Sequence, residues 1–125
     1  MNPTRDFNYV SDIVRGFILA ANSDQCIGQA INLGSNFEVS IGETMELISG
    51  IMKVQVETEQ EEQRVRPENS EVERLWACNL KAKEILGWAP VYGGRAGFVK
   101  GLEETIAWFS NANNLKLYKS NIYNI

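Results

Sequence analysis

Residues 64–88 read RVRPENSEVERLWACNLKAKEILGW, and this stretch indicates the fold class most clearly. Its residues 71–77 have the pattern of a strand. Asn79 then stands where a helix cap is expected, and residues 80–86 are a short run of helix formers. Gly87 suits the left-handed position that ends a helix. A strand followed at once by a capped helix predicts a domain that mixes both kinds of element.

The remaining segments continue this alternation of helix and strand. Apolar residues at helical spacing predict helices over residues 12–21, 41–52 and 98–109. Short apolar or alternating runs predict strands over residues 29–35 and 53–59. The expected fold class is therefore α/β, in an α+β-like small domain with about four helices and short strands.

Two of these helices have recognisable start signals. Ser11 is expected to cap the helix that begins at Asp12, whose carboxylate suits the first turn. Ser40 and Glu43 have the spacing of a capping box, in which each side chain accepts a hydrogen bond from the other residue's backbone. The second signal is the stronger because both partners are present.

Composition limits the kinds of partner. A chain of 125 residues with 44% apolar residues suits one domain with a single core. The net charge of −4 argues against nucleic acid as a partner, because phosphate backbones are bound by surplus lysine and arginine. No stretch is apolar enough for a membrane span or a signal peptide, so a cytoplasmic location is expected.

The residues that most often carry chemistry are scarce. The chain contains no histidine, which removes histidine-based triads and histidine-ligated metal sites. Cys26 and Cys78 lack a CxxC partner, so we expect each to be a buried, reduced thiol. Any chemistry must then depend on carboxylates, arginine, lysine or tyrosine.

The pair Arg64 and Arg66, before Pro67, is the first candidate site. A guanidinium group presents a planar fork of donors that matches phosphate, and proline pushes the preceding residue into an extended conformation. The sequence therefore indicates an anion site. Alternatively, the two arginines only neutralise the glutamates that precede them. Arg5, next to Asp6, either holds the start of a strand or approaches the same anion.

Two further motifs favour ordinary structural roles. The segment GGRAG, residues 93–97, superficially resembles a phosphate loop, but it lacks the GxGxxG spacing and the lysine of a Walker motif. A flexible loop before the last helix is the expectation there. The tyrosines have no lysine four residues later and are expected to serve packing and interfaces: Tyr9, Tyr92, Tyr118 and Tyr123.

Several segments in order carry a resemblance to a known family. They are TRDFNYVSDIVRGFILA, AINLGS, SIGETMELI, the stretch at residues 64–88, and GLEETIAWF. Together they resemble the C-terminal, substrate-binding part of extended short-chain dehydrogenase/reductases. The chain is most similar to the NAD-dependent nucleotide-sugar 4,6-dehydratases and epimerases, including the tail YKSNIYNI. The resemblance covers nearly the whole chain.

The resemblance implies a binding site. Arg5 in TRDF and Arg66 in RVRP resemble ligands of the nucleotide diphosphate, and Glu71 in SEVERL resembles a ribose contact. The expected ligand is a UDP- or GDP-linked hexosamine, bound weakly. Residues 1–110 would form the nucleotide-sugar-binding subdomain, and residues 111–125 a tail that docks or lies at an interface.

The resemblance also implies what this chain does not contain. The family has a glycine-rich NAD motif and a catalytic tyrosine and lysine in an N-terminal Rossmann domain, and none of these is present in this sequence. We therefore expect no catalytic residue, no cofactor bound by this chain alone, and no hydride transfer by it unaided. A homodimer through the face that the NAD domain would cover is expected, or a split enzyme with a separate NAD-binding chain.

Two positions depart from the family pattern. Cys78 stands where the family often has aspartate, just before the helix at residues 80–86. The segment at residues 93–97 is richer in glycine than the usual approach to the final helix. Both departures affect how a helix begins.

Overall fold

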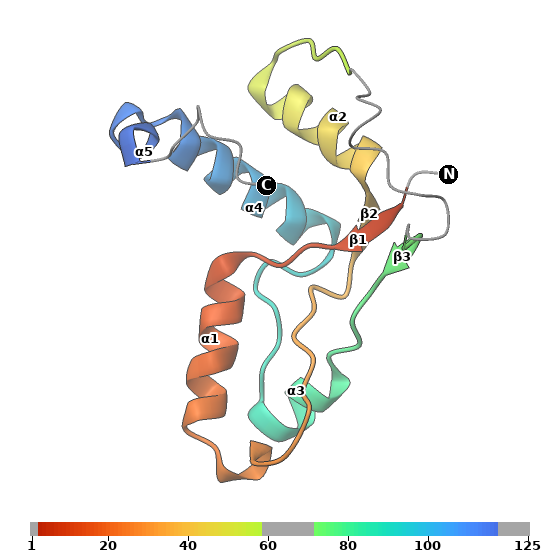
Figure 1. The fold of residues 1–125 in the computed structure, drawn as a ribbon, viewed down its shortest axis with the longest axis vertical. Helices are drawn as coiled ribbons and strands as arrows, with labels where there is room; N and C mark the ends of the chain where they lie inside the picture. Colours follow the sequence, from red (N-terminus) through yellow and green to blue (C-terminus); the bar gives the residue numbers. More distant parts are fainter. Residues whose placement is uncertain (1–2, 59–71, 118–125) are drawn as a thin grey trace.

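The computed structural model describes residues 3–58 and 72–117 (Figure 1). Within them lie three short strands, five α-helices and one 3-10 turn. The order is β1 (Thr4–Asp6), α1 (Val10–Ala21), η1 (Asp24–Cys26), β2 (Glu38–Ser40), α2 (Ile41–Met52), β3 (Arg74–Leu75), α3 (Leu80–Leu86), α4 (Gly94–Ser110) and α5 (Ala112–Leu117). The predicted small α/β fold is confirmed, with one more helix than expected in the described chain.

The sheet has the strand order β2-β1-β3 and joins two groups of helices. Strand β1 pairs antiparallel with β2, where Arg5 lies opposite Val39, and parallel with β3, where it lies opposite Leu75. Helices α1 and α3 contact each other and η1 on one side of the sheet, while α2, α4 and α5 lie on the other (Figure 1). Val39, the middle residue of the edge strand β2, is buried.

Local signals position two helices as expected. The capping box of α2 is present: the Glu43 backbone N–H donates to Ser40 Oγ at 3.1 Å, and the Ser40 N–H donates to Glu43 Oε2 at 3.5 Å. Gly87 ends α3 with a φ of 62°, which confirms its left-handed position. Such short-range rules act within one turn of helix, so the sequence alone reveals them.

Of the other two predicted caps, Ser11 is wrong and Asn79 is correct in position only. Helix α1 begins at Val10, so Ser11 lies inside the helix and Tyr9 precedes it without a side-chain cap. The Asn79 side chain does not cap α3; its amide Nδ2 donates to the Gly34 carbonyl oxygen at 3.0 Å. For Asn79, a tertiary contact replaces the local cap.

The predicted strands are mostly absent from the described chain. Residues 29–35 and 53–58 form no strand, and the third prediction, over residues 71–77, shrinks to Arg74–Leu75, with Glu71 outside the described residues. A strand needs a neighbouring strand to bond with, and residues 29–35 and 53–58 have none in the described chain. The segment at residues 53–58 is exposed.

Residues 93–97 do not form the expected loop. Helix α4 begins at Gly94, so most of GGRAG is its first turn. A Cβ atom on Gly97 would lie 2.3 Å from the Tyr92 carbonyl carbon and 2.6 Å from the carbonyl oxygen. Glycine is required there because the helix packs directly on the backbone of the preceding turn.

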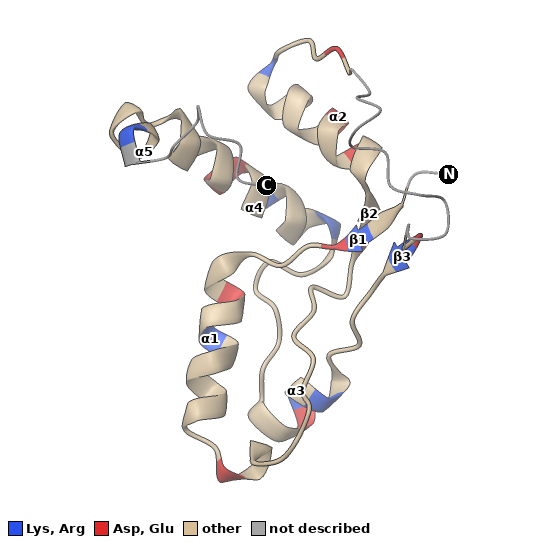
Figure 2. Ribbon diagram, viewed as in Figure 1, with Lys and Arg blue, Asp and Glu red and all other residues tan. Residues whose placement is uncertain are grey.

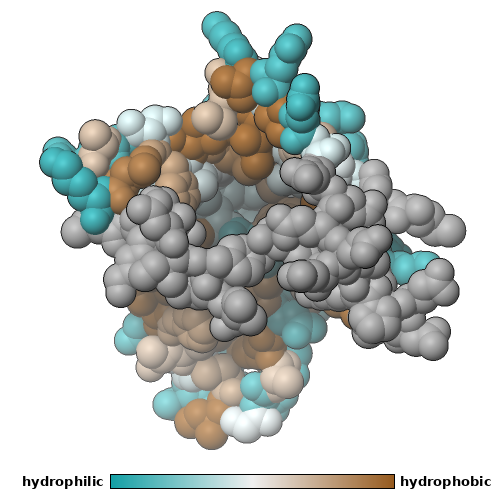
Figure 3. Space-filling view, turned by 45° about the horizontal axis from the view of Figure 1, so that its top comes forward, coloured by the Kyte–Doolittle hydropathy of each residue, from teal (hydrophilic) through white to brown (hydrophobic). Residues whose placement is uncertain are grey.

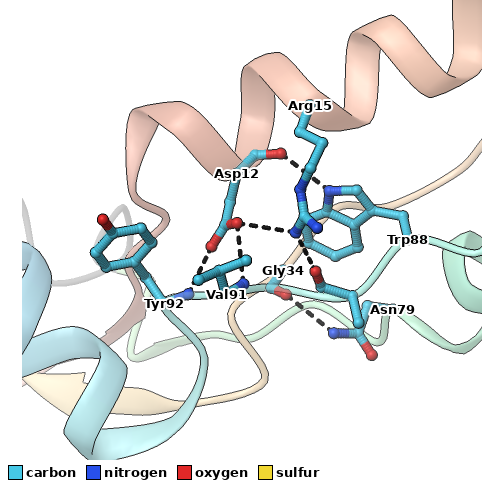
Figure 4. Close-up of polar contacts among 8 residues, drawn as sticks. Asp12, Arg15, Gly34, Asn79, Trp88, Val91 and Tyr92 are labelled. Atoms are coloured by element: carbon cyan, nitrogen blue, oxygen red, sulfur yellow. Dashed lines mark hydrogen bonds and ion pairs between the residues drawn. The ribbon is translucent and has the colours of Figure 1, made fainter.

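A buried carboxylate organises the junction between α1 and the chain that follows α3. Asp12 is 2% exposed, and its Oδ1 and Oδ2 accept hydrogen bonds from the backbone N–H groups of Val91 at 2.9 Å and Tyr92 at 2.8 Å (Figure 4). Arg15 Nη2 donates to Asp12 Oδ1 at 3.0 Å, and the buried Trp88 indole N–H donates to the Asp12 carbonyl oxygen at 2.9 Å. One charged residue thereby fixes a whole connecting segment on the helix.

A second aspartate does the same beside the sheet. Asp6 Oδ1 accepts from the Ser35 backbone N–H at 2.8 Å and from its hydroxyl at 2.5 Å. Asp6 Oδ2 accepts from the Ala77 N–H at 3.2 Å. Gly34 lies against Ala77, where a Cβ atom would meet the Ala77 carbonyl oxygen at 2.7 Å. The two aspartates of TRDFNYVSD therefore tie three distant segments to the first strand and helix.

The cysteine prediction is corrected. Both cysteines are free thiols, as expected, but Cys78 is exposed and Cys26 is only half-buried. Cys26 Sγ lies 3.1 Å from the Ala20 carbonyl oxygen and 3.0 Å from the Ser23 carbonyl oxygen, so it closes the turn after α1. Cys78 lies just before α3, on a segment that the described chain leaves open to solvent.

The surface of the described chain is mixed in charge and partly apolar. Acidic and basic residues are interspersed over the helices and the sheet (Figure 2). Apolar surface is visible above and below the grey residues in Figure 3. Helix α1 carries large exposed apolar side chains: Val10, Val14, Phe17 and Ile18. Among the described residues, no helix has the length and apolarity needed to cross a membrane.

Candidate functional site

Arg5 is the one predicted site residue that the structure describes. It lies in the middle strand of the sheet, half-buried, where β1 pairs with both neighbours. Its Nη1 donates to the Thr4 carbonyl oxygen at 2.8 Å and to the Val72 carbonyl oxygen at 2.8 Å. The guanidinium group is thereby held against the segment that enters β3.

Arg66 and Glu71 lie outside the described residues, as does Arg64. The expected convergence of Arg5 and Arg66 on one diphosphate therefore stays a prediction. Val72 directly follows Glu71 in the sequence, and Arg5 bonds to the Val72 backbone. This contact places Arg5 beside Val72, the first described residue after Glu71.

Sequence reasoning missed an ion pair on the same sheet. Arg74 donates from Nε to Glu38 Oε2 and from Nη2 to Glu38 Oε1, both at 2.7 Å, and its guanidinium carbon lies 5.9 Å from the centre of the Trp76 ring. The hydrogen bonds from Arg74 lower the pKa of Glu38. Thr4 Oγ1 also donates to Glu38 Oε2, at 3.1 Å.

Arg74 does not add a third arginine to the predicted diphosphate site of Arg5 and Arg66. Thr4 pairs with Arg74 and Arg5 with Leu75, and successive residues of a strand point to opposite faces of a sheet. Arg5 and Arg74 therefore belong to opposite faces. No short-range signal connects Arg74 with Glu38, because 36 residues separate them. The pair ties β3 to β2 across the central strand.

A tyrosine cluster joins the start of α1 to α4. The rings of Tyr9 and Tyr92 lie 4.2 Å apart between centroids, and the Tyr92 hydroxyl donates to Glu104 Oε1 at 2.8 Å. This hydrogen bond raises the pKa of Tyr92 to about 12 and lowers the pKa of Glu104. Lys100 Nζ lies 4.9 Å from the centre of the Tyr92 ring. The described tyrosines pack between elements, as the sequence predicted.

A cleft of about 610 Å³ opens beside this cluster, between the start of α1 and the C-terminal helices. Its lining is Tyr9, Val10, Glu104, Thr105, Ala107, Trp108, Phe109, Asn111 and Asn114. The charged residue in this lining is Glu104, and its carboxylate would repel a phosphate. The cleft therefore does not compete with the arginines as the predicted diphosphate site.

The glycines of GGRAG pack closely against the segment before α4. A Cβ on Gly93 would meet Pro90 Cγ at 2.8 Å, and one on Gly97 would meet the Tyr92 backbone. The Gly94 N–H donates to the Ser35 carbonyl oxygen at 3.3 Å. The segment does not have the GxGxxG spacing of an NAD phosphate loop. Among residues 3–58 and 72–117, no group of three or more His, Cys, Asp or Glu could hold a metal ion.

Curated relatives match most of the chain. The UDP-glucuronic acid decarboxylase 1 of Danio rerio is 34% identical over 113 residues, which are 86% of this chain and 23% of the relative. The putative UDP-glucose 4-epimerase of Methanocaldococcus jannaschii is 29% identical over 112 residues, which are 90% of this chain and 33% of the relative. This chain therefore corresponds to a third or less of these proteins.

Solved structures agree with the curated relatives. The epimerase Mth375 from Methanothermobacter thermautotrophicus matches with a TM-score of 0.73 and 32% identity, over 93% of this chain and 32% of that one. The UDP-glucose 4-epimerase of Thermotoga maritima, solved with UDP-glucose, matches with a TM-score of 0.70 and 25% identity, over 86% and 32% of the two chains. The described fold is therefore that of a part of these enzymes.

A family model confirms the resemblance seen in the sequence. The model described as GDP-mannose 4,6 dehydratase matches residues 1–100, which is most of the chain. The chain spans about a third of the length of the epimerases that it matches. It belongs to the GDP-mannose 4,6 dehydratase family, among the nucleotide-sugar epimerases and dehydratases.

Proposed function

We propose that this chain supplies the nucleotide-sugar-binding surface of an NAD-dependent epimerase or dehydratase and is catalytically incomplete by itself. Arg5 and Arg66 bind the diphosphate, and Glu71 binds the ribose hydroxyl groups. The ligand is a UDP- or GDP-linked hexosamine. Hydride transfer needs a nicotinamide held against the sugar, and this sequence offers no glycine-rich motif to hold one.

The observation that carries this proposal is the position of Arg5. Its guanidinium Nη1 bonds to the Val72 carbonyl oxygen, one residue after Glu71, across 67 residues of sequence. The segments TRDF and SEVERL, both predicted to bind the nucleotide, are therefore in contact at Arg5 and Val72. The Thermotoga maritima relative, solved with UDP-glucose, supports the ligand class.

Binding is expected to be weak. A charge-assisted hydrogen bond contributes about 1.5–3 kcal/mol. Two or three such contacts must first offset the entropy lost on association, which leaves a Kd of about 1 mM. Phosphate is held by charge, so the affinity should also fall as salt is added.

A titration of UDP-glucose, followed by backbone amide shifts, tests the proposal. Arg66→Ala should weaken binding about tenfold, because that ratio corresponds to the loss of one charge-assisted bond. Arg5→Lys should weaken it less, since lysine keeps the charge and loses the planar fork. Arg95→Ala is the matched control for Arg66→Ala, because Arg95 is exposed on α4 and pairs with Glu43 at 3.5 Å.

Two results would contradict the proposal. One is the absence of amide shifts at Arg5 and Val72 at ligand concentrations well above 1 mM, the Kd expected from two or three contacts. The other is an equal loss of affinity in Arg95→Ala and Arg66→Ala, which would indicate nonspecific attraction by positive charge. A purified chain that converts UDP-glucose unaided would refute the catalytic incompleteness.

A structural role is the second candidate, and the exposed side of α1 favours it. Phe17 is 68% and Ile18 57% exposed there, and contiguous apolar surface of this kind usually contacts a partner. That partner is either a second copy, giving a homodimer, or a separate NAD-binding chain, giving a split enzyme. The two free thiols support a reducing compartment such as the cytoplasm.

A further inference from the structure

The cleft beside the tyrosine cluster has the size of a small-molecule site. Its volume of about 610 Å³ lies within the range of such sites, about 300–1,000 Å³. Three elements border it: the start of α1, and the helices α4 and α5 that lie above it in Figure 1. Partner proteins need about 800 Å² of surface, whereas a small ligand needs a concave site. The cleft therefore suits a small molecule.

Glu104 gives this cleft a negative charge. It is the charged residue in the lining, and no lysine or arginine is among the described residues that line it. The Tyr92 hydroxyl donates to Glu104 Oε1 at 2.8 Å, and hydrogen bonds from Tyr92 and Tyr9 lower the pKa of Glu104. A carboxylate has about four acceptor positions, so two tyrosines leave room for further donors.

Lys100 does not cancel this charge. Its Nζ lies 4.0 Å from Glu104 Oε1, at the limit of an ion pair, and its side chain is 59% exposed. Exposed pairs of this kind contribute little. Lys100 also lies outside the lining, over the ring of Tyr92 at 4.9 Å. The charge of Glu104 therefore remains available to a ligand in the cleft.

Neutral oxygen atoms add acceptors to the carboxylate. The Thr105 hydroxyl donates to the Gly101 carbonyl oxygen at 2.7 Å, and Asn114 Nδ2 donates to the Trp108 carbonyl oxygen at 3.0 Å. Thr105 and Asn114 both line the cleft, and their side-chain oxygens can still accept. A ligand with several N–H donors matches this lining.

Aromatic rings provide the rest of the recognition. Tyr9 and Trp108 line the cleft, and Trp108 is 45% exposed. The face of an aromatic ring, tryptophan above all, attracts a cation within about 6 Å of its centre. A carboxylate beside aromatic faces is therefore suited to a positively charged group.

We propose that this cleft binds a small organic cation, an ammonium group carried on an apolar body. The ammonium group pairs with the Glu104 carboxylate and lies against Trp108. The apolar body covers Val10 and Phe109, which are 68% and 40% exposed. An anion would be repelled, and a neutral apolar ligand would cover the carboxylate without giving it a partner, which is costly.

A titration of two matched ligands into the 125-residue chain tests this inference. Phenethylamine is an ammonium ion at neutral pH, and 2-phenylethanol is a neutral molecule of nearly the same shape. Backbone amide shifts at Glu104, Trp108 and Asn114 report the binding. We expect phenethylamine to bind at least about tenfold tighter than 2-phenylethanol, because only the amine gains the charge pair and the ring contact.

A matched pair of variants locates the charge. Glu104→Gln keeps the shape of the side chain and should weaken the binding of phenethylamine about tenfold, with 2-phenylethanol unaffected. Glu103→Gln removes the same charge from the exposed neighbour on α4, which does not line the cleft. It should leave both affinities unchanged.

Three results would overturn the inference. Equal affinities of the two ligands would show that the cleft does not recognise charge. Equal losses in Glu103→Gln and Glu104→Gln would indicate general attraction to a chain of net charge −4. Shifts confined to residues outside the cleft would place the cation elsewhere.

The test stays decisive if Glu104→Gln does not fold, because the two ligands are first compared in the unaltered chain. It is also separate from the test of the proposed function. No nucleotide sugar is added, and the reporting amides belong to α4 and α5. Those of the diphosphate test are at Arg5 and Val72.

Discussion

Helix α1 has two sides that are opposite in character. On the inner side, the charged Asp12 is 2% exposed and Gly16 is buried against Leu33. On the outer side, Val14 and Phe17 are 49% and 68% exposed. The inner side is fixed by directed hydrogen bonds, and the outer side offers apolar surface without a cover in the described chain. The apolar stripe of a helix therefore shows which face is stabilised by burial, but it does not identify the partner that covers that face.

The largest expected effect comes from the inner side. Asp12→Ala removes the acceptor of the Val91 and Tyr92 backbone N–H groups and leaves Arg15 without its carboxylate partner. We expect a loss of about 3 kcal/mol in the free energy of unfolding, because part-buried donors lose their partner. Urea unfolding measures it as a lower midpoint with an unchanged slope.

Asp24→Ala is the control for this change, because Asp24 is an exposed aspartate in η1. It should change the free energy of unfolding by less than about 0.5 kcal/mol. Equal stability of the Asp12 and Asp24 variants would mean that the inner side of α1 is not what holds the junction.

A smaller effect is expected where α4 packs on the segment that Asp12 holds. Gly97→Ala would place a methyl group 2.3 Å from the Tyr92 carbonyl carbon, and a backbone neighbour has little room to move. We expect a loss of about 2 kcal/mol in the free energy of unfolding from overpacking.

Thermal unfolding of Gly97→Ala and Gly50→Ala measures this difference. Gly50 lies in α2, where a Cβ atom would meet nothing within 4 Å, so alanine should stabilise the helix by about 0.5–1 kcal/mol. Shifts of the same sign in the two variants would contradict the close packing at Gly97.

The tyrosine cluster predicts a pH dependence. The hydrogen bond to Glu104 raises the pKa of Tyr92 from 10.0 to about 12, so the folded state holds this proton more tightly than the unfolded state. The stabilisation is complete below pH 10 and is lost as the pH rises towards 12. Tyr92→Phe should therefore flatten the fall in the unfolding midpoint between pH 10.0 and about 12.

The acid side of the same cluster has the opposite sign. The hydrogen bond from Tyr92 lowers the pKa of Glu104 below 4.5, so its stabilisation is present above that pH and is lost as the pH falls further. Glu104→Gln should remove this part of the loss of stability in acid. The part that comes from Glu38, whose pKa is also lowered, should remain. An unchanged alkaline profile in Tyr92→Phe would show that the cluster does not stabilise the contact between α1 and α4.

The smallest effect on stability is expected on the outer side. Phe17→Asp replaces a side chain that is 68% exposed, so the chain alone should lose less than about 0.5 kcal/mol in its free energy of unfolding. The retention time in size exclusion should shift only if α1 contacts a partner. A loss as large as that in Asp12→Ala would mean that the two sides of the helix do not differ.

The sequence predicts those features whose cause lies within a few residues. The capping box of Ser40 and Glu43 and the left-handed Gly87 act within one helical turn. Local patterns could not show whether residues 29–35 and 53–59 form strands. Strand pairing depends on a neighbouring strand, and the described chain does not supply one for these segments. Their local pattern is the same whether or not such a neighbour exists.

The long-range contacts of charged groups could not be predicted from local sequence patterns. Asp12 has the sequence features of a helix start, yet it accepts hydrogen bonds from residues about 80 positions away. Arg74 pairs with Glu38 across 36 residues. Arg5 was singled out beside Asp6, and the family resemblance gave it a phosphate-binding role. Its contact with Val72 tests neither that role nor those of Arg66 and Glu71. Their roles stay predictions.

A comparison of two ligands tests whether Arg5 and Arg66 bind a diphosphate. The dissociation constants of UDP-glucose and uridine are measured by amide shifts at low and at physiological salt. We predict that UDP-glucose binds at least about tenfold tighter than uridine at low salt, and that salt narrows the ratio. Equal affinities for the two ligands, independent of salt, would contradict the claim.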